Sequence, residues 1–303
     1  MKPARSVIWL SGLIAVLSAI SSGIGLFWHD TGHSFVVTTM RGEIVEMYGQ
    51  GVYRYESLRN GVGFKGVDLF MLVVGMPLLL VATRLYQRGS LRGGLLLVGT
   101  LAYLVYNSAH LVFSYAYNHL FIVYIMLFSA SLFACVLSFR SIDAQELAAR
   151  FTPHLLRRSI ATFLFAVGVS LIIVWIGLDL LPALLQGHAP RLMGATTLVT
   201  HAIDVGVIAP LAFGSGLLLL RRAPLGYLLA ATLLVLSSVL GAGVLALSAA
   251  QALAGVLTTV ETVVFVVPFV VLTAVGIVLT VGMFRAISGS APEQTAAMQT
   301  APV

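Results

Sequence analysis

Eight apolar runs, each about as long as a bilayer is thick, dominate the sequence. A helix needs about 20 apolar residues to cross ~30 Å of hydrocarbon, and runs of this length recur between short segments that contain arginine. The pattern therefore predicts an all-α membrane protein with eight transmembrane helices. The predicted spans are residues 7–27, 67–86, 93–115, 119–139, 158–185, 196–220, 224–252 and 259–284.

The composition supports a membrane environment and argues against a nucleic-acid-binding protein. Hydrophobic residues make up 59% of the chain and charged residues 9%, whereas a soluble domain carries roughly 25% charged residues. The net charge of +6 could indicate nucleic acid as a partner. However, the basic residues stand at the ends of apolar runs and not on one patch, which is typical of membrane proteins. We therefore expect membrane lipid, and no nucleic acid, around this chain.

The basic residues predict which side of the membrane each loop occupies. They cluster in alternate loops, and cytoplasmic loops carry an excess of Lys and Arg. Both termini are then cytoplasmic, and the tail 287–303 is predicted to be disordered because it lacks apolar residues. A cleaved signal peptide is the alternative for residues 1–27, but the apolar stretch is long enough to span and no clean cleavage site follows. The basic residues in the segments assigned to the cytoplasm are Lys2, Arg5, Arg84, Arg88, Arg92, Arg140, Arg150, Arg157, Arg158, Arg221, Arg222 and Arg285.

The segments between the spans contain two further predicted elements. In the loop 28–66, apolar and polar residues partly alternate around glycine-containing turn candidates, which predicts two or three short strands. We expect a small extracytoplasmic β-hairpin cap over the outer ends of the helices. On the cytoplasmic side, residues 141–157 are predicted to form a short helix along the membrane surface.

The two halves of the chain resemble each other. Asp68 in the second span is matched by Asp204 in the sixth, and the fourth and eighth spans end in the similar motifs "SFRSID" and "MFRAIS". These matches occur in the same order, which predicts two four-helix repeats in parallel orientation, residues 1–140 and 158–286. Parallel repeats are common in transporters, whose sites lie at the repeat interface.

Polar and charged side chains inside the predicted spans lie at one depth. Counted at ~1.5 Å per residue from the cytoplasmic arginines, they fall in the outer part of the hydrocarbon core. A charged side chain in lipid costs ~2.5–3.5 kcal/mol at a helix centre, so these residues should face one another or water. We therefore expect one shared, outward-facing pocket. Its candidate ligand-binding residues are Asp68, Asn107, His110, Tyr117, Asp179, His201, Asp204 and Glu261.

His201 and Asp204, one turn apart in the sixth span, have three interpretations. The pair could bind a ligand, with the carboxylate fixing the imidazole tautomer. With His110 it could hold a divalent metal, although the spacing matches no diagnostic motif. It could also form a hydrogen bond that joins two spans. No phosphate-binding loop is present, so no nucleotide is expected, and the single cysteine, Cys135, excludes an intrachain disulfide.

The stretches "RGEIVEMYGQGVYRYES", "QRGSLRGG" and "YNHLFIVYIMLFSASLFA" carry a family resemblance. The chain resembles a group of bacterial multi-pass membrane proteins, best over residues 35–140. The resemblance implies a location in the bacterial cytoplasmic membrane, and it carries over no activity and no site residue. Eight spans are also found in haem A synthase, but here the histidines do not recur at matching places and the paired outer cysteines are missing.

Three functions remain open from the sequence. The first is a binder of a small solute, an ion or a lipid headgroup at the outer face, with transport as an extension. The second is a membrane-embedded enzyme, with or without a metal, that acts at the outer leaflet. The third is a non-catalytic subunit whose outer cap docks another protein.

Overall fold

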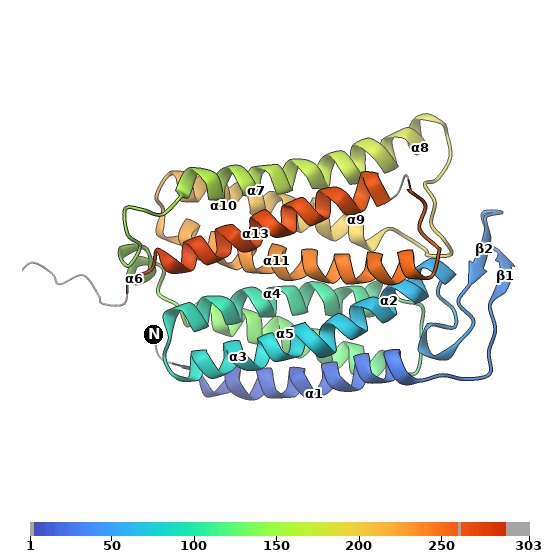
Figure 1. Ribbon diagram of the computed structural model, residues 1–303, viewed down its shortest axis with the longest axis horizontal. Helices are drawn as coiled ribbons and strands as arrows, with labels where there is room; N and C mark the ends of the chain where they lie inside the picture. Colours follow the sequence, from blue (N-terminus) through green and yellow to red (C-terminus); the bar gives the residue numbers. More distant parts are fainter. Residues whose placement is uncertain (1–2, 260–261, 289–303) are drawn as a thin grey trace, which may run out of the picture.

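The computed structural model describes residues 3–259 and 262–288. In this part, eight helices are long and apolar enough to cross a membrane, as predicted, and they run side by side (Figure 1). Four are single elements: α1 (Arg5–Phe27), α4 (Leu91–Phe113), α5 (Phe121–Arg140) and α11 (Pro224–Leu253). The other four contain a π-helical segment. The second span consists of α2 (Leu58–Phe70), η2 (Met71–Gly75) and α3 (Met76–Gln87), and the fifth of α7 (Arg157–Ile172), η3 (Ile173–Leu180) and α8 (Leu181–Leu185). The sixth consists of α9 (Val199–Ile203), η4 (Asp204–Ile208) and α10 (Ala209–Leu220), and the eighth includes η5 (Thr262–Val266) and α13 (Val267–Arg285).

A proline follows each of these π-helical segments. Pro77, Pro182, Pro210 and Pro268 stand in the first turn of the α-helix that continues the span. Proline has no backbone N–H and its ring clashes with the carbonyl one turn earlier, so the regular hydrogen-bond ladder cannot pass through it. A π-helical turn accommodates the interruption and rotates the preceding side chains relative to the rest of the helix.

The two ends of the bundle differ in their elements and charges. One end holds the short helix α6 (Ala144–Ala149), and we call it the α6 end. The start and the end of the described chain both lie there: the Ala4 N–H donates to the Tyr86 hydroxyl at 3.0 Å, and Phe151 pairs with Ile287. The opposite end carries the two strands and is called the hairpin end (Figure 1). Arg88 after α3, Arg140 as the last residue of α5, and Arg221 after α10 stand at the α6 end.

Each half of the bundle has its own apolar core. One core is built by α1, α3, α4 and α5, and the other by α6, α7, α10, α11 and α13. Helices α4 and α11 contribute to both cores, so they form the central pair between the halves. This explains why these two spans are buried over most of their circumference, whereas α7–α8 and α13 expose much of theirs.

Glycines allow the central helices to approach closely. A methyl group at Gly99 of α4 would meet Val235 of α11, and one at Gly66 of α2 would overlap the carbonyl oxygen of Ala246 of α11. Small residues at such crossings are typical of transmembrane helix pairs. The segment 58–66, which was predicted as part of the loop 28–66, belongs to the helix α2 and packs against α11. The Ser57 hydroxyl caps its start by accepting from the Asn60 N–H at 3.2 Å.

The loop at the hairpin end is shorter than predicted, residues 28–57, and ties the two halves together. It contains two antiparallel strands, β1 (Phe35–Thr38) and β2 (Ile44–Met47), and a short 3₁₀ turn, Gly51–Tyr53. The Glu43 carboxylate accepts from the Met193 N–H of the second half at 3.1 Å. The Glu56 carboxyl accepts from the Ala116 N–H, between α4 and α5, at 2.6 Å.

The predicted helix in 141–157 is present as α6, and it packs against α11. Its Leu147 is fully buried in the core of the second half. Asp143 caps its start by accepting from the backbone N–H groups of Gln145 and Glu146.

We expect Gly66→Ala to destabilise the protein, because the new methyl group overlaps backbone atoms of α11 and one helix must shift. A matched control is Gly282→Ala in α13, where a methyl group meets nothing within 4 Å. That change should be neutral or stabilising, since Ala is about 1 kcal/mol better than Gly within a helix. Thermal unfolding in detergent measures both. Equal melting temperatures for the two variants would contradict this packing.

We expect the stability of the protein to fall as the pH rises from about 4.5 to about 7, in part through Glu56. Burial raises the pKa of this carboxyl from 4.5 to about 7, so the folded state keeps a proton that the unfolded chain releases. Full ionisation costs on the order of 3 kcal/mol. Glu56→Gln should flatten this part of the profile of melting temperature against pH, whereas the exposed Glu46→Gln should leave it unchanged. An unaltered slope in Glu56→Gln would contradict the assignment.

Candidate functional site

Asp204 is the centre of a polar cluster at the hairpin end of the second half. It starts η4, its residue is 5% exposed, and its two carboxylate oxygens have different donors. The Tyr106 hydroxyl of α4 donates to Oδ1 at 2.9 Å, and the Trp175 indole N–H of η3 donates to Oδ2 at 2.8 Å. Because a buried carboxylate without donors is very unfavourable, these contacts hold three spans in one arrangement.

His201 lies one turn before Asp204 and has a different partner. Its Nε2 is 2.7 Å from the Asp179 carboxylate of η3, and its ring lies 4.2 Å from the Trp175 ring, measured between centroids. The side chain of Asp179 is 40% exposed, so the pair is open on one side. The Nδ1 atom of His201 is buried and has no hydrogen-bond partner among the described residues. If the Nε2–H of the neutral ring donates to Asp179, the Nδ1 atom is a hydrogen-bond acceptor.

His110 extends the cluster on α4. Its Nδ1 is 2.9 Å from the Tyr106 carbonyl oxygen, so Nδ1–H donates along the helix. Its Nε2 is then an acceptor, 3.1 Å from the Thr200 hydroxyl of α9. We call the whole set the Asp204 cluster; its members are Tyr106, His110, Trp175, Asp179, Thr200, His201 and Asp204.

The predicted pair of His201 with Asp204 is not formed in the described structure. The two side chains have different partners, because Asp204 accepts from Tyr106 and Trp175 while His201 contacts Asp179. The π-helical turn begins at Asp204 and changes the regular spacing of side chains around the helix at this point. Tyr106 and Trp175, which donate to Asp204, are not among the predicted site residues, because aromatic side chains in an apolar span are first expected to pack or to anchor the span at the interface. Their signal was present: Tyr106 stands one turn before His110, and Trp175 one turn before Asp179.

A pocket opens beside His201 at the hairpin end. Its volume is about 510 Å³, within the range of small-molecule sites. One wall is aliphatic, with Ile176 and Leu180 from η3 and Val205 from η4, and the others come from the loop before α9 and from the strand hairpin. Its polar side chains are Arg41, Thr196, Thr197 and His201. We call this space the hairpin-end pocket.

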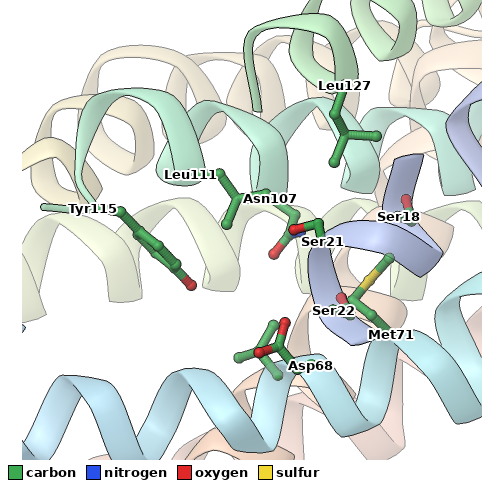
Figure 2. Close-up of a pocket in the computed structure, with 10 residues that line it drawn as sticks. Ser18, Ser21, Ser22, Asp68, Met71, Asn107, Leu111, Tyr115 and Leu127 are labelled. Atoms are coloured by element: carbon green, nitrogen blue, oxygen red, sulfur yellow. The ribbon is translucent and has the colours of Figure 1, made fainter. Parts of the chain in front are cut away.

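The remaining predicted residues do not join this pocket. Asp68 and Asn107 line a separate small cavity in the first half (Figure 2). Tyr117 is 76% exposed and contacts Phe121, and Glu261 lies outside the described residues. The single shared pocket that was predicted is therefore divided in two by α4, whose Asn107 faces one half while His110 contacts the other.

The predicted metal ligands are not assembled into one set. His110, His201 and Asp204 each contact a different protein group, as described above. Across residues 3–259 and 262–288, no group of three or more His, Cys, Asp or Glu is placed to hold a metal ion.

Comparison with protein-family models, with curated proteins and with solved structures finds no match for this chain. Function is therefore inferred from its own side chains. The π-helical turns are relevant here, because such turns are frequent at functional sites. Both η3 and η4 contribute members of the Asp204 cluster and walls of the hairpin-end pocket.

We expect Trp175→Phe to lower the stability by about 2 kcal/mol, because it removes a hydrogen bond to a charged group and leaves one carboxylate oxygen without its donor. Trp9→Phe is the matched control, since Trp9 is 79% exposed on α1. Unfolding in mixed detergent micelles measures both. In a protein that already carries Asp204→Asn, Trp175→Phe should lower the stability by less than it does in the wild type. If the two losses of stability simply add, the contact between Trp175 and Asp204 contributes nothing.

Proposed function

We propose that this chain is a multi-pass membrane protein that binds a small amphiphilic molecule with an anionic headgroup in the hairpin-end pocket. The observation that carries the proposal is the pocket's lining. A guanidinium, two hydroxyls and an imidazole line the same space as the aliphatic side chains of Ile176, Leu180 and Val205. Arg41 suits a phosphate or carboxylate group, because its planar fork donates two parallel hydrogen bonds.

The charges of the two ends support an orientation for the proposed protein. Arg88, Arg140 and Arg221 stand at the α6 end, which the positive-inside rule assigns to the cytoplasm. Both termini are then cytoplasmic, and the pocket opens at the extracytoplasmic face. We place the protein in the bacterial cytoplasmic membrane, as its family resemblance implies.

An internal duplication fits the same proposal. Helices α3 and α10 have equal lengths, each follows a π-helical turn, and they start 133 residues apart (209 − 76 = 133). The turns that follow α3 and α10 also agree. The Ser90 N–H donates to the Leu85 carbonyl oxygen, and 133 residues later the Ala223 N–H donates to the Leu218 carbonyl oxygen. At this spacing the counterpart of Asp68 is His201, and not Asp204 as the sequence comparison predicted.

Lateral access supports a lipid-like ligand over a freely soluble one. Ala202 and Gly206, on the pocket wall, are exposed residues of a membrane span, so that wall faces the acyl chains in the proposed orientation. A molecule with an apolar tail can therefore enter from the outer leaflet while its headgroup meets Arg41. The core of the second half towards the α6 end consists of residues such as Leu164, Leu219 and Leu234, which favours binding at one face over transport.

A membrane-embedded enzyme is the second candidate, and one observation favours it. Asp179 and His201 form a carboxylate–imidazole pair beside the pocket, the arrangement that orients a histidine for general base catalysis. The described members of the Asp204 cluster include no cysteine that could act as a nucleophile. The Thr200 hydroxyl contacts His110 rather than His201. Binding therefore remains the first proposal.

We expect dioctanoyl phosphatidylglycerol to bind the purified protein saturably and to raise its melting temperature, since a ligand of the folded state stabilises it. Arg41→Gln should weaken this binding at least tenfold, because it removes the cation that meets the headgroup. Ala202→Trp, which fills the pocket, should abolish it. Arg54→Gln is the matched control, since Arg54 stands at the same end but pairs with Asp30 at 3.2 Å.

Two results would count against the proposal. Undiminished binding to Ala202→Trp would place the lipid elsewhere on the protein. Equal stabilisation by inorganic phosphate would mean that the site recognises a free anion and that the aliphatic wall has no part in binding.

A further inference from the structure

The first half contains a second polar cavity, separate from the hairpin-end pocket and not used by the proposed function. It lies between α1, α2 and α4, and its volume of about 10 Å³ is that of a single water molecule or a small ion. Figure 2 shows side chains from these helices directed towards the same space. Six of its ten lining residues carry a side-chain oxygen: Ser18, Ser21, Ser22, Asp68, Asn107 and Tyr115. We call it the Asp68 cavity.

Several of these oxygens are held in place and can accept a ligand. Asp68 is 5% exposed, and the Tyr53 hydroxyl donates to its Oδ2 at 2.5 Å. The Ser22 hydroxyl lies within hydrogen-bonding reach of the same carboxyl group. The Ser18 hydroxyl is buried, with 1% of the residue exposed, and has no partner among the described residues. Ser18 lines the same cavity as the Asp68 carboxylate, so its hydroxyl is available to a ligand bound there.

The charge around the cavity is unbalanced. Asp68 is the one acidic residue among the described residues that line it, and these lining residues include no lysine or arginine. Lys65 is nearby, and its ammonium group lies over the Tyr48 ring and 3.4 Å from His29. The other titratable groups near Asp68 are Tyr53, Glu56, Tyr103, Tyr115 and Tyr124. Lys65 acts on Asp68 without lining the cavity. An ionised buried carboxylate is costly unless a positive charge stands directly beside it, and one bound cation of charge +1 would supply that charge.

The backbone of α1 completes the enclosure. A methyl group at Gly25 would overlap the Asp68 Oδ2 atom and would lie 2.6 Å from the Tyr53 hydroxyl. Glycine at this position therefore lets α1 close over the carboxylate. Two residues earlier, a methyl group at Gly23 meets nothing within 4 Å.

We propose that the Asp68 cavity binds one small monovalent cation with the size and oxygen preference of Na⁺. The ligand set is one carboxylate together with neutral hydroxyl and amide oxygens, which matches a single positive charge. Hard divalent cations such as Ca²⁺ are usually held by several carboxylates, whereas the described lining of this cavity contains one. The small volume favours Na⁺ over larger monovalent ions.

The test compares melting temperatures of the full-length protein in NaCl and in choline chloride at constant ionic strength. We expect a saturable rise with Na⁺ and a weaker effect of K⁺, because a ligand bound only by the folded state stabilises it. Asp68→Asn and Gly25→Ala should both abolish the difference between the two salts. Gly23→Ala on the same helix and Asp204→Asn in the other half should retain it.

The outcomes separate this proposal from its alternatives. Equal melting temperatures in sodium and choline salts would overturn it and leave the cavity with a water molecule or a protonated carboxyl group. A sodium effect that persists in both Asp68→Asn and Gly25→Ala would also overturn it. If neither variant folds, the ²³Na NMR signal measured with the wild-type protein decides. Line broadening of this signal that excess K⁺ does not reverse supports the site, and the absence of broadening refutes it.

Discussion

The burial of carboxylates inside apolar helices is the constraint on which the arrangement of this protein depends. An ionised group removed from water must be compensated by donors or by a countercharge. Asp204 meets this requirement with a tyrosine of α4 and a tryptophan of η3, and Asp68 meets part of it with Tyr53. Each contact comes from a different element, so the compensation fixes how neighbouring spans are rotated about their axes. Apolar contacts alone would tolerate other rotations of the same helices.

Helix α4 connects the two polar sites and keeps them apart. Its Asn107 lines the Asp68 cavity. Tyr106, one position before Asn107, and His110, three positions after it, contact the second half. Close packing of Gly99 against α11 holds this helix in the centre of the bundle. A rigid central pair therefore presents polar groups to both sides at nearly the same depth.

The strand hairpin contributes to the second half although it follows α1 in the chain. Glu43 accepts a backbone hydrogen bond from Met193, and Arg41 lines the pocket beside His201. Met193 itself has a positive φ of 49°, a conformation that residues other than glycine rarely adopt. The loop before α9 is thus held in place by a segment from the first half, and the proposed ligand site depends on both halves.

The sequence by itself determined the eight spans, the hairpin and the short helix at the α6 end, because hydropathy, alternation and capping are local properties of the chain. It also located the polar residues along each span. Only the tertiary structure decided their partners: His201 contacts Asp179 rather than Asp204, and Asp68 is enclosed apart from both. Partner choice depends on helix rotation, which π-helical turns and glycine contacts alter and which no single span encodes. For the same reason residues 58–66 form a helix, because α11 supplies the packing that their glycine-rich sequence lacks.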